Sequence, residues 1–344
     1  MPNDLTRRAL GRAALGALAA PAILKTARAD DVLKIRCSLD TAPSHPRNQG
    51  VVDYLKKVEA ASGGKITGEV FHSGQLFADI NVSKALLQGQ VEMAVPGLWV
   101  LTGIVPDTDF VQLPLFYGQP AEVTHRATDG KPGQYVAAQL EKKLRVHIPG
   151  PWMDLGYQNW YSTKTPLTGP DSFKGLKIRS PGGAAISWRI KFFGGLPNVT
   201  PWPNVPLALS QGTFDALVST DESVNSAKLW DAGVRYSYAD HQFMGQYVPM
   251  FTDAFWGKLS PDQQKMLTDI WAQNIGGYRA AAFASQANAR KALEANNIKV
   301  TDPSAAELAE SRKKMLAQQD GMIKDTNISP DLVKLVQESI GSSA

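Results

Sequence analysis

The sequence predicts an α/β protein of two domains, with a ligand cleft between them and one long helix that spans both. Strand-like stretches alternate with helical ones, which indicates parallel strands joined by helices. The 344 residues suffice for about two domains. An Ala-rich helical pattern runs from Ser260 to about Ala295, and at 1.5 Å per residue this helix measures about 50 Å, more than one small domain needs. Clefts between domains are preferred ligand sites.

Residues 1–29 have the organisation of an export signal. A basic segment precedes twelve uncharged residues, 13–24, and the small-x-small sequence at 27–29. Twelve helical residues span about 18 Å, too short for a hydrocarbon core of about 30 Å. The segment 6–12 (TRRALGR) is similar to a twin-arginine signal, although its last residues depart from that pattern and leave the Sec route as an alternative. We predict a mature chain that starts at Asp30 and lies in a bacterial periplasm.

Charge and cysteine content exclude several classes of protein. The net charge of +4 comes from the leader, which holds five of the 36 Lys and Arg residues and one of the 32 Asp and Glu residues, so the rest of the chain is neutral. A nucleic-acid-binding surface needs an excess of Lys and Arg, which the mature chain lacks. The single cysteine, Cys37, excludes an internal disulfide and a zinc site of several thiolates, and its strand-like surroundings predict a buried side chain.

The first half of the mature chain alternates strands and helices. Alternating apolar and polar residues predict a strand at 32–39. Pro46 and the spacing of the apolar residues after it predict a helix that ends at Ser62, before two glycines. The other predicted elements of this half are strands at 65–71 and 91–95, a helix at 79–88, and a helix at 121–140 that is broken near Gly130.

The second half repeats this alternation and ends in the long helix. Ser260 is a suitable N-cap for that helix, because a proline follows it at the first helical position. The adjacent acids Asp221 and Glu222 are more typical of a helix start than of a catalytic pair. The other predicted elements are strands at 156–162, 176–179, 199–201, 214–218, 235–239 and 246–252, and helices at 184–193, 205–211 and 222–230.

Motifs for enzyme chemistry are missing from the sequence. It contains no nucleophile elbow, zinc-protease motif, phosphate-binding loop or dinucleotide-binding motif. The five histidines are scattered, and none lies three to five residues from another. We therefore predict a binding protein without catalytic residues, metal or cofactor.

The mature chain resembles the solute-binding subunits of TRAP (tripartite ATP-independent periplasmic) transporters, of the C4-dicarboxylate-binding type, from Val32 to about Ile323. Its most specific part is residues 175–181 (GLKIRSP), followed some thirty residues later by 208–215 (ALSQGTFD). Shorter matches with the family pattern occur, in the expected order, at 63–66 (GGKI), 74–76 (GQL), 112–116 (QLPLF) and 256–260 (WGKLS).

The resemblance implies a periplasmic binding protein of the type II-like fold, which binds a small organic acid and delivers it to a membrane permease. We place the two domains at residues 30–154 with 246–280 and at residues 155–245 with 281–344. Two alternatives stay open. The protein could sense the same acid and report to a signalling protein, or it could be a periplasmic enzyme that acts on the acid.

The resemblance also suggests ligand-binding residues. Arg179 takes the position of the family arginine that binds the ligand carboxylate, and a guanidinium suits this role because it offers two parallel N–H donors. Trp202 falls where an aromatic ring covers the ligand, with core packing as its alternative role. Ser219 or Thr220 replaces an asparagine that bonds the same carboxylate, or caps a strand end. Asp79 accepts from a ligand hydroxyl or is the N-cap of the helix it opens.

Two departures from the family suggest a ligand with one carboxylate. Gln158 stands where sialic-acid-binding members have a second arginine, and Asn204 stands where they have a glutamate. Neither amide contributes a charge. Trp99 and Trp152 are candidates for aromatic walls. We therefore expect the ligand to be a monocarboxylate, a sugar acid or an aromatic acid.

Overall fold

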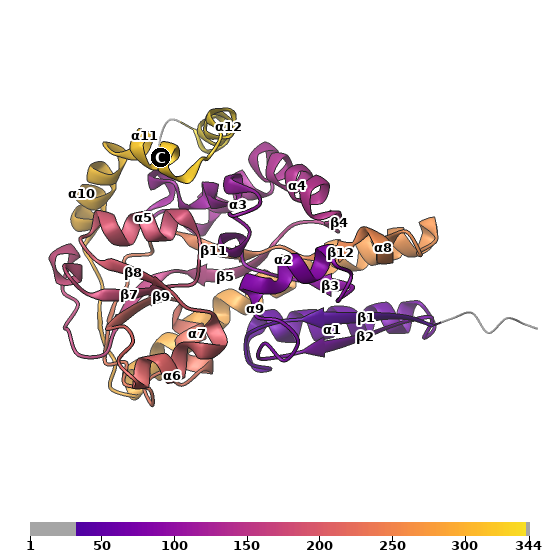
Figure 1. Cartoon of the computed structure of the whole chain (residues 1–344), viewed down its shortest axis with the longest axis horizontal. Coiled ribbons are helices and arrows are strands. Elements are labelled where there is room, and N and C mark those ends of the chain that lie inside the picture. Colours follow the sequence, from indigo (N-terminus) through magenta and orange to yellow (C-terminus); the bar gives the residue numbers. More distant parts are fainter. Residues whose placement is uncertain (1–31, 342–344) are drawn as a thin grey trace, which may run out of the picture. The chain divides into compact units, whose positions relative to one another are not determined.

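Two mixed β-sheets and a two-stranded ribbon carry the α/β fold (Figure 1). The computed structural model describes residues 32–341, so the predicted export signal lies outside the described residues. Within residues 32–341, no helix is both long enough and apolar enough to cross a membrane. The predicted limits of the two domains stay a prediction.

The first sheet has the strand order β2-β1-β3-β12-β4. Its strand β1 runs parallel to β2 and β3, whereas β12 is antiparallel to both of its neighbours. Cys37 is fully buried in β1, as predicted. The strands of this sheet are β1 (Leu33–Ser38), β2 (Ile66–Phe71), β3 (Met93–Ala94), β4 (Val146–His147) and β12 (Met250–Thr252).

The second sheet has the order β13-β10-β6-β9-β7-β8. Its strand β7 is parallel to β8 and β9, so the carboxyl ends of these three strands meet at one edge of the sheet. A separate ribbon pairs β5 (Met153–Tyr157) with β11 (Met244–Tyr247). The strands of the second sheet are β6 (Asn159–Ser162), β7 (Lys177–Ser180), β8 (Leu196–Val199), β9 (Ala216–Ser219), β10 (Tyr236–Tyr238) and β13 (Lys299–Thr301).

The helices begin where the sequence predicts them in most cases. The helix predicted at 121–140 is divided near Gly130 into α3 and α4, as expected. Asp221 opens α7, which follows the N-cap Thr220. The helices are α1 (Pro46–Ala61), α2 (Asp79–Leu87), α3 (Ala121–Thr128), α4 (Lys131–Leu144), α5 (Ala184–Phe192), α6 (Val205–Ser210), α7 (Asp221–Ser226), α8 (Asp253–Trp256), α9 (Pro261–Ala295), α10 (Ala305–Leu316), α11 (Gln319–Thr326) and α12 (Pro330–Ile340).

The long helix α9 contacts α1, which packs on the first sheet, and α7, which follows β9 of the second sheet (Figure 1). Ser260 is its N-cap and forms a reciprocal capping box with Gln263, as the sequence predicts. Gly156 of β5 has φ +126°, and a Cβ there would lie 2.7 Å from the side chain of Gln286 on α9. The glycine thus lets Gln286 reach the backbone of β5, where its amide donates to the carbonyl of Leu155 over 2.6 Å.

Several predicted boundaries are wrong. The stretch 246–252 is not one strand but parts of β11 and β12, because Pro249 has no N–H to continue a ladder and the chain changes partners there. The stretch 156–162 is likewise divided between β5 and β6 at Gln158. The strand placed at 199–201 is β8, which ends at Val199 where its register with β7 ends.

Further differences concern helices and short segments. The helix predicted at 222–230 ends at Ser226, and Lys228 then adopts φ +48°. Several elements were not predicted: β4, β13, α8 and the helices α10 to α12, together with the 3-10 segments η1 (Leu98–Val100), η2 (Pro106–Gln112), η3 (Pro114–Phe116), η4 (Pro170–Phe173) and η5 (Trp202–Asn204). These 3-10 segments are one to two turns long, and such short pieces leave little periodicity in a sequence.

Asp240 is a core carboxyl group that forms no ion pair with any described residue. Asp240 is fully buried and accepts hydrogen bonds from Tyr117 Oη at 2.6 Å and from Trp160 Nε1 at 2.8 Å. Its other oxygen has no hydrogen-bond partner among the described residues. Burial raises the pKa of Asp240 to about 7, against the opposing effect of these hydrogen bonds and of Arg189.

We predict that Asp240 makes the protein less stable as the pH rises. Because its pKa is raised on folding, its stabilising contribution is present below about pH 4 and is lost as the pH rises toward 7, by up to about 1.4 kcal/mol per pH unit. The Asp240→Asn variant keeps an acceptor oxygen but does not titrate. We expect its melting temperature to fall less than that of the wild type between about pH 5 and pH 8.

Thermal unfolding followed by circular dichroism measures this difference. Asp231→Asn, at an exposed turn, is the matched control and should show the wild-type profile. Parallel profiles for wild type and Asp240→Asn would contradict the raised pKa.

Candidate functional site

A cavity enclosing about 470 Å³ of empty space, part of it open to solvent, lies where residues of both sheets and of the β5–β11 ribbon meet. Six of the residues singled out from the sequence line it: Asp79, Trp99, Gln158, Arg179, Trp202 and Ser219. The remaining lining residues are Asp40, Thr41, Ile80, Val100, Leu155, Pro181, Pro201, Val218, Ser223 and Tyr247.

Arg179 brings a buried positive charge to this cavity. It lies near the carboxyl end of β7, only 2% exposed, and donates from Nε to the Thr200 carbonyl at 3.0 Å and from Nη1 to the Val218 carbonyl at 3.2 Å. Its guanidinium forms no ion pair within residues 32–341, and burial lowers its pKa to about 9. A buried charge without a counter-ion is costly unless a ligand supplies one.

Three more polar side chains line the cavity without a hydrogen-bond partner among the described residues. Gln158, Ser219 and Tyr247 are at most 4% exposed, and none of their side chains hydrogen-bonds to a described residue. Buried polar groups are nearly always hydrogen-bonded. Together with Arg179, these groups therefore form a set of donors and acceptors that a bound molecule could satisfy.

Aromatic rings form two walls of the cavity. The Arg179 guanidinium lies 5.4 Å from the ring centroid of Trp202, which is half-buried. The Trp99 ring lies 5.6 Å from that of Tyr247. Both tryptophans add apolar surface beside the charged group, which favours a ligand with an apolar or ring-shaped face.

Three other predicted site residues lie outside the cavity wall. Trp152 is in the core, where its ring centroid is 6.3 Å from that of Phe110. Thr220 is the N-cap of α7 and accepts from the backbone N–H of Ser223. Asn204 is exposed at the end of η5.

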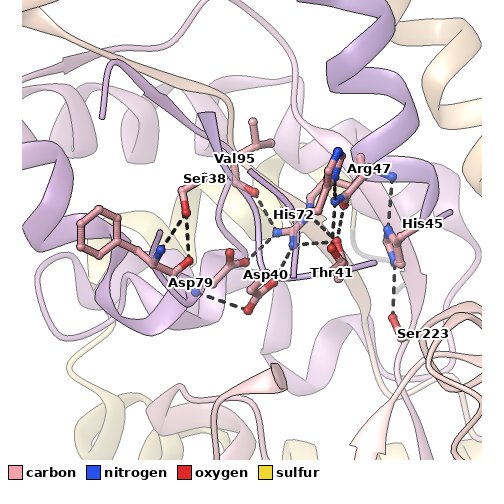
Figure 2. Close-up of polar contacts among 11 residues, drawn as sticks. Ser38, Asp40, Thr41, His45, Arg47, His72, Asp79, Val95 and Ser223 are labelled. Carbon is pink, nitrogen blue, oxygen red and sulfur yellow. Dashed lines mark hydrogen bonds and ion pairs between the residues drawn. The ribbon is translucent and has the colours of Figure 1, made fainter. Parts of the chain in front are cut away.

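A second guanidinium, that of Arg47, lies beside Asp40 and Asp79, two residues of the cavity wall (Figure 2). Arg47 is fully buried, with Nη2 2.6 Å from Asp40 Oδ1 and Nη1 2.6 Å from Asp79 Oδ2. The N-cap of α2 is Ala78, so the alternative role of Asp79 as an N-cap is wrong. Burial raises the pKa of Asp79 to about 7, with Asp40 adding to the rise and Arg47 opposing it.

His45 connects this wall to the other side of the cavity. Its Nδ1 accepts from the backbone N–H of Arg47 at 3.2 Å, so in the neutral ring the proton is on Nε2. That Nε2 lies 3.4 Å from Ser223 Oγ on α7 (Figure 2). Burial, with a smaller effect of Arg47, lowers the pKa of His45 to about 3, which keeps the ring neutral at physiological pH.

Part of the cavity wall was not predicted from the sequence. Asp40 and Thr41 lie in the loop after β1, and ligands of α/β proteins bind outside the carboxyl ends of strands, so their position could have identified them. Ser223 and Tyr247 carry no such signal, because only the folded chain brings α7 and β11 to the cavity.

The family model for bacterial extracellular solute-binding protein, family 7, matches residues 38–325. The chain belongs to this family. The match confirms the resemblance to solute-binding proteins of TRAP transporters and identifies the chain as a periplasmic solute receptor. It also excludes the enzyme alternative, because the members are binding proteins.

Related proteins agree with this assignment. The C4-dicarboxylate-binding periplasmic protein of Rhodobacter capsulatus is 29% identical over 292 residues, which cover 85% of either chain. The 2,3-diketo-L-gulonate-binding periplasmic protein of Escherichia coli is 27% identical, over 88% of this chain and 91% of its own length.

Solved structures confirm the predicted α/β fold of two domains. The sugar acid binding protein of Advenella mimigardefordensis, in complex with galactonate, superposes with a TM-score of 0.83 at 20% identity, covering 89% of this chain and 97% of that one. A TRAP solute-binding protein of Desulfovibrio salexigens, with bound orotic acid, has a TM-score of 0.82 at 19% identity, covering 89% and 98%.

We predict that Arg47 is needed for stability. The Arg47→Met variant leaves two buried carboxylates without their cation, which should lower the free energy of unfolding by about 3–5 kcal/mol. Urea denaturation measures this loss. Lys57→Met is the matched control: its ion pair with Asp53 is exposed, and we expect a loss below about 1 kcal/mol. Equal losses in the two variants would contradict the structural role of Arg47.

Proposed function

We propose that this receptor binds a small organic acid through Arg179 and delivers it to the membrane permease of a TRAP transporter. One observation carries the proposal: Arg179 is a buried cation at a cavity, and no carboxylate of the described residues is in ion-pair contact with it, although Asp40 acts on it from a greater distance. A ligand carboxylate supplies that contact. The export route that we propose is the twin-arginine pathway.

The groups beside Arg179 suit a carboxylate. Nη2 of Arg179 has no protein acceptor, and Ser219 Oγ, on the neighbouring strand β9, is a free hydroxyl. A guanidinium holds a carboxylate with charge-assisted hydrogen bonds, and a hydroxyl adds a further donor. We assign Arg179 as the anchor and Ser219 as its helper.

The rest of the wall favours an acid with one carboxylate and a ring or hydroxyl groups. Trp99 and Trp202 supply apolar faces, while Gln158 and Tyr247 can donate to hydroxyl or carbonyl oxygens. The ligand class that we propose is a monocarboxylate, such as a sugar acid or an aromatic acid. The galactonate and orotic acid bound by the structures of similar fold are carboxylates of these kinds.

A thermal-shift screen of the chain from Asp30 onward tests the ligand class. The panel holds sugar acids, aromatic acids, 2-oxo acids, dicarboxylates and neutral sugars. A ligand at about 100 times its Kd stabilises the folded state by about 2.7 kcal/mol, which raises the melting temperature measurably. A rise with neutral sugars alone would refute the assignment of an organic acid.

We predict that Arg179→Met separates binding from stability. Loss of the anchor should weaken acid binding by about 2–5 kcal/mol, or roughly 30- to several-thousand-fold, in isothermal titration calorimetry. The melting temperature of the ligand-free variant should stay at or above the wild-type value, because a buried cation without a counter-ion is removed.

Arg36→Met serves as the control, since Arg36 pairs with Glu92 away from the cavity. It should bind the acid as the wild type does. If Arg179→Met kept the wild-type affinity, Arg179 would not be the anchor.

A further inference from the structure

The guanidinium of Arg47 is the second positive charge near the ligand cavity, but it is already fully occupied. Its Nε donates to Thr41 Oγ1 at 3.3 Å, and Nη2 donates to Asp40 Oδ1 at 2.6 Å and to the same Thr41 oxygen at 2.9 Å. Its Nη1 donates to Asp79 Oδ2 at 2.6 Å and to the Val95 carbonyl at 3.1 Å. A guanidinium has five N–H donors, so none is left for a ligand (Figure 2).

The residues that occupy Arg47 also separate it from the cavity. Asp40, Thr41 and Asp79 line the cavity wall, whereas Arg47 does not. A molecule that reaches this wall therefore meets Asp40, Thr41 and Asp79 before it meets Arg47. No N–H group of the described residues donates to Asp79 Oδ1, so this oxygen can accept from a ligand donor.

The charge at this wall is unfavourable for an anion. The two carboxylates balance the guanidiniums of Arg47 and Arg179 when both acids are ionised, so the first ligand carboxylate already gives the site a net negative charge. Burial, with Asp40 adding to its effect, raises the pKa of Asp79, which indicates that this group bears extra negative charge with difficulty. A second ligand carboxylate placed here would add a like charge in a buried setting, at a cost of several kcal/mol.

We propose that Asp40 and Asp79 are internal counter-ions that neutralise Arg47 and so make the cavity select acids with one carboxylate over dicarboxylates. The inference rests on the proposed function, because it requires that Arg179 holds the first carboxylate. It adds which residues set the charge of the ligand. It also adds that the end of the ligand farther from Arg179 carries a hydrogen-bond donor, such as a hydroxyl group.

Matched pairs of acids test this selectivity by isothermal titration calorimetry. Galactonate and galactarate share a carbon skeleton, and so do 4-hydroxybutanoate and succinate; in each pair a hydroxymethyl group replaces one carboxylate. In the pair whose acids bind, we expect the wild type to bind the monocarboxylate at least about tenfold more tightly than the dicarboxylate.

The Asp79→Asn variant should reverse this preference. An asparagine oxygen can still accept from Arg47, and its amide N–H then faces the cavity as a donor. We expect the ratio of monocarboxylate to dicarboxylate affinity to fall from at least about ten in the wild type to below about one in the variant. Asp129→Asn is the control: Asp129 binds Arg279 through two hydrogen bonds outside the cavity wall, and its loss should leave the ratio unchanged.

The pH dependence of the wild type gives a second readout that needs no variant. A hydroxyl donor binds ionised Asp79, whereas a carboxylate binds only its protonated form. Affinity for galactarate should therefore rise as the pH falls from about 8 to 6, while affinity for galactonate should fall or stay constant. Asp79 interacts electrostatically with four other titratable groups. These are Arg47 on α1, Asp40 after β1, Cys37 in β1 and Tyr247 in β11.

Three outcomes decide between the possibilities. Reversal of the preference in Asp79→Asn, with the opposite pH trends, supports the inference. Equal or tighter binding of the dicarboxylates to the wild type, with Arg179→Met still abolishing binding, overturns the inference and leaves the proposed function intact. Binding that Arg179→Met does not affect overturns both. If Asp79→Asn fails to fold, Asp40→Asn takes its place, because it likewise replaces a carboxylate that bonds Arg47, here at Nη2, with a neutral amide.

Discussion

The structure depends on one requirement: a guanidinium buried away from water needs a partner for its charge and for each N–H group. Arg47 meets this requirement within the protein. Its partners come from the loop after β1, from the start of α2 and from the end of β3, so the side chain joins three segments at the carboxyl edge of the first sheet. Arg179, across the cavity, meets the requirement only in part.

A third buried arginine shows that missing partners alone do not define a ligand site. Arg189 on α5 is fully buried, and its Nε and Nη1 have no hydrogen-bond partner among the described residues. Burial lowers its pKa as it does that of Arg179, whereas the carboxylates around Arg47 outweigh burial and raise the pKa of that residue. Arg189 does not line the cavity. What distinguishes Arg179 is that three other unpartnered side chains share its cavity.

The sequence predicted best those features that depend on neighbouring residues. The start of α9 follows from a serine and a proline in succession, and the break between α3 and α4 follows from Gly130. Strand ends were predicted poorly where the chain changes partners, as at Gln158 and Pro249, because pairing is decided by distant strands. The helices after residue 304 were missed, although Ser304 and Glu307 form a capping box that signals a helix start.

In the candidate site too, features that depend on neighbouring residues were predicted, whereas features that depend on distant residues were not. Arg179 lies in a motif and could be named from the sequence. Trp202 and Ser219 could be named only from their positions in the family resemblance, and both line the same cavity. For Thr220 and Trp152, the sequence could not distinguish ligand binding from helix capping and core packing. Those roles depend on which face of an element is buried. No pattern in the sequence indicated that Arg47 is buried and fully hydrogen-bonded, because its partners lie up to 48 residues away along the chain.

The segment that neutralises Arg47 also fixes the contact across the cavity. The backbone N–H of Arg47 bonds His45 Nδ1, which leaves the ring proton on Nε2, toward Ser223 of α7. Thr220 Oγ1 donates to the same Ser223 oxygen at 3.0 Å, so Thr220 supports the site from behind without lining it. The residue whose side chain bonds Asp40 and Asp79 therefore also fixes, through its backbone N–H, the ring that contacts Ser223. Arg47 thus holds in place both the two carboxylates that line the cavity and the contact of His45 with α7.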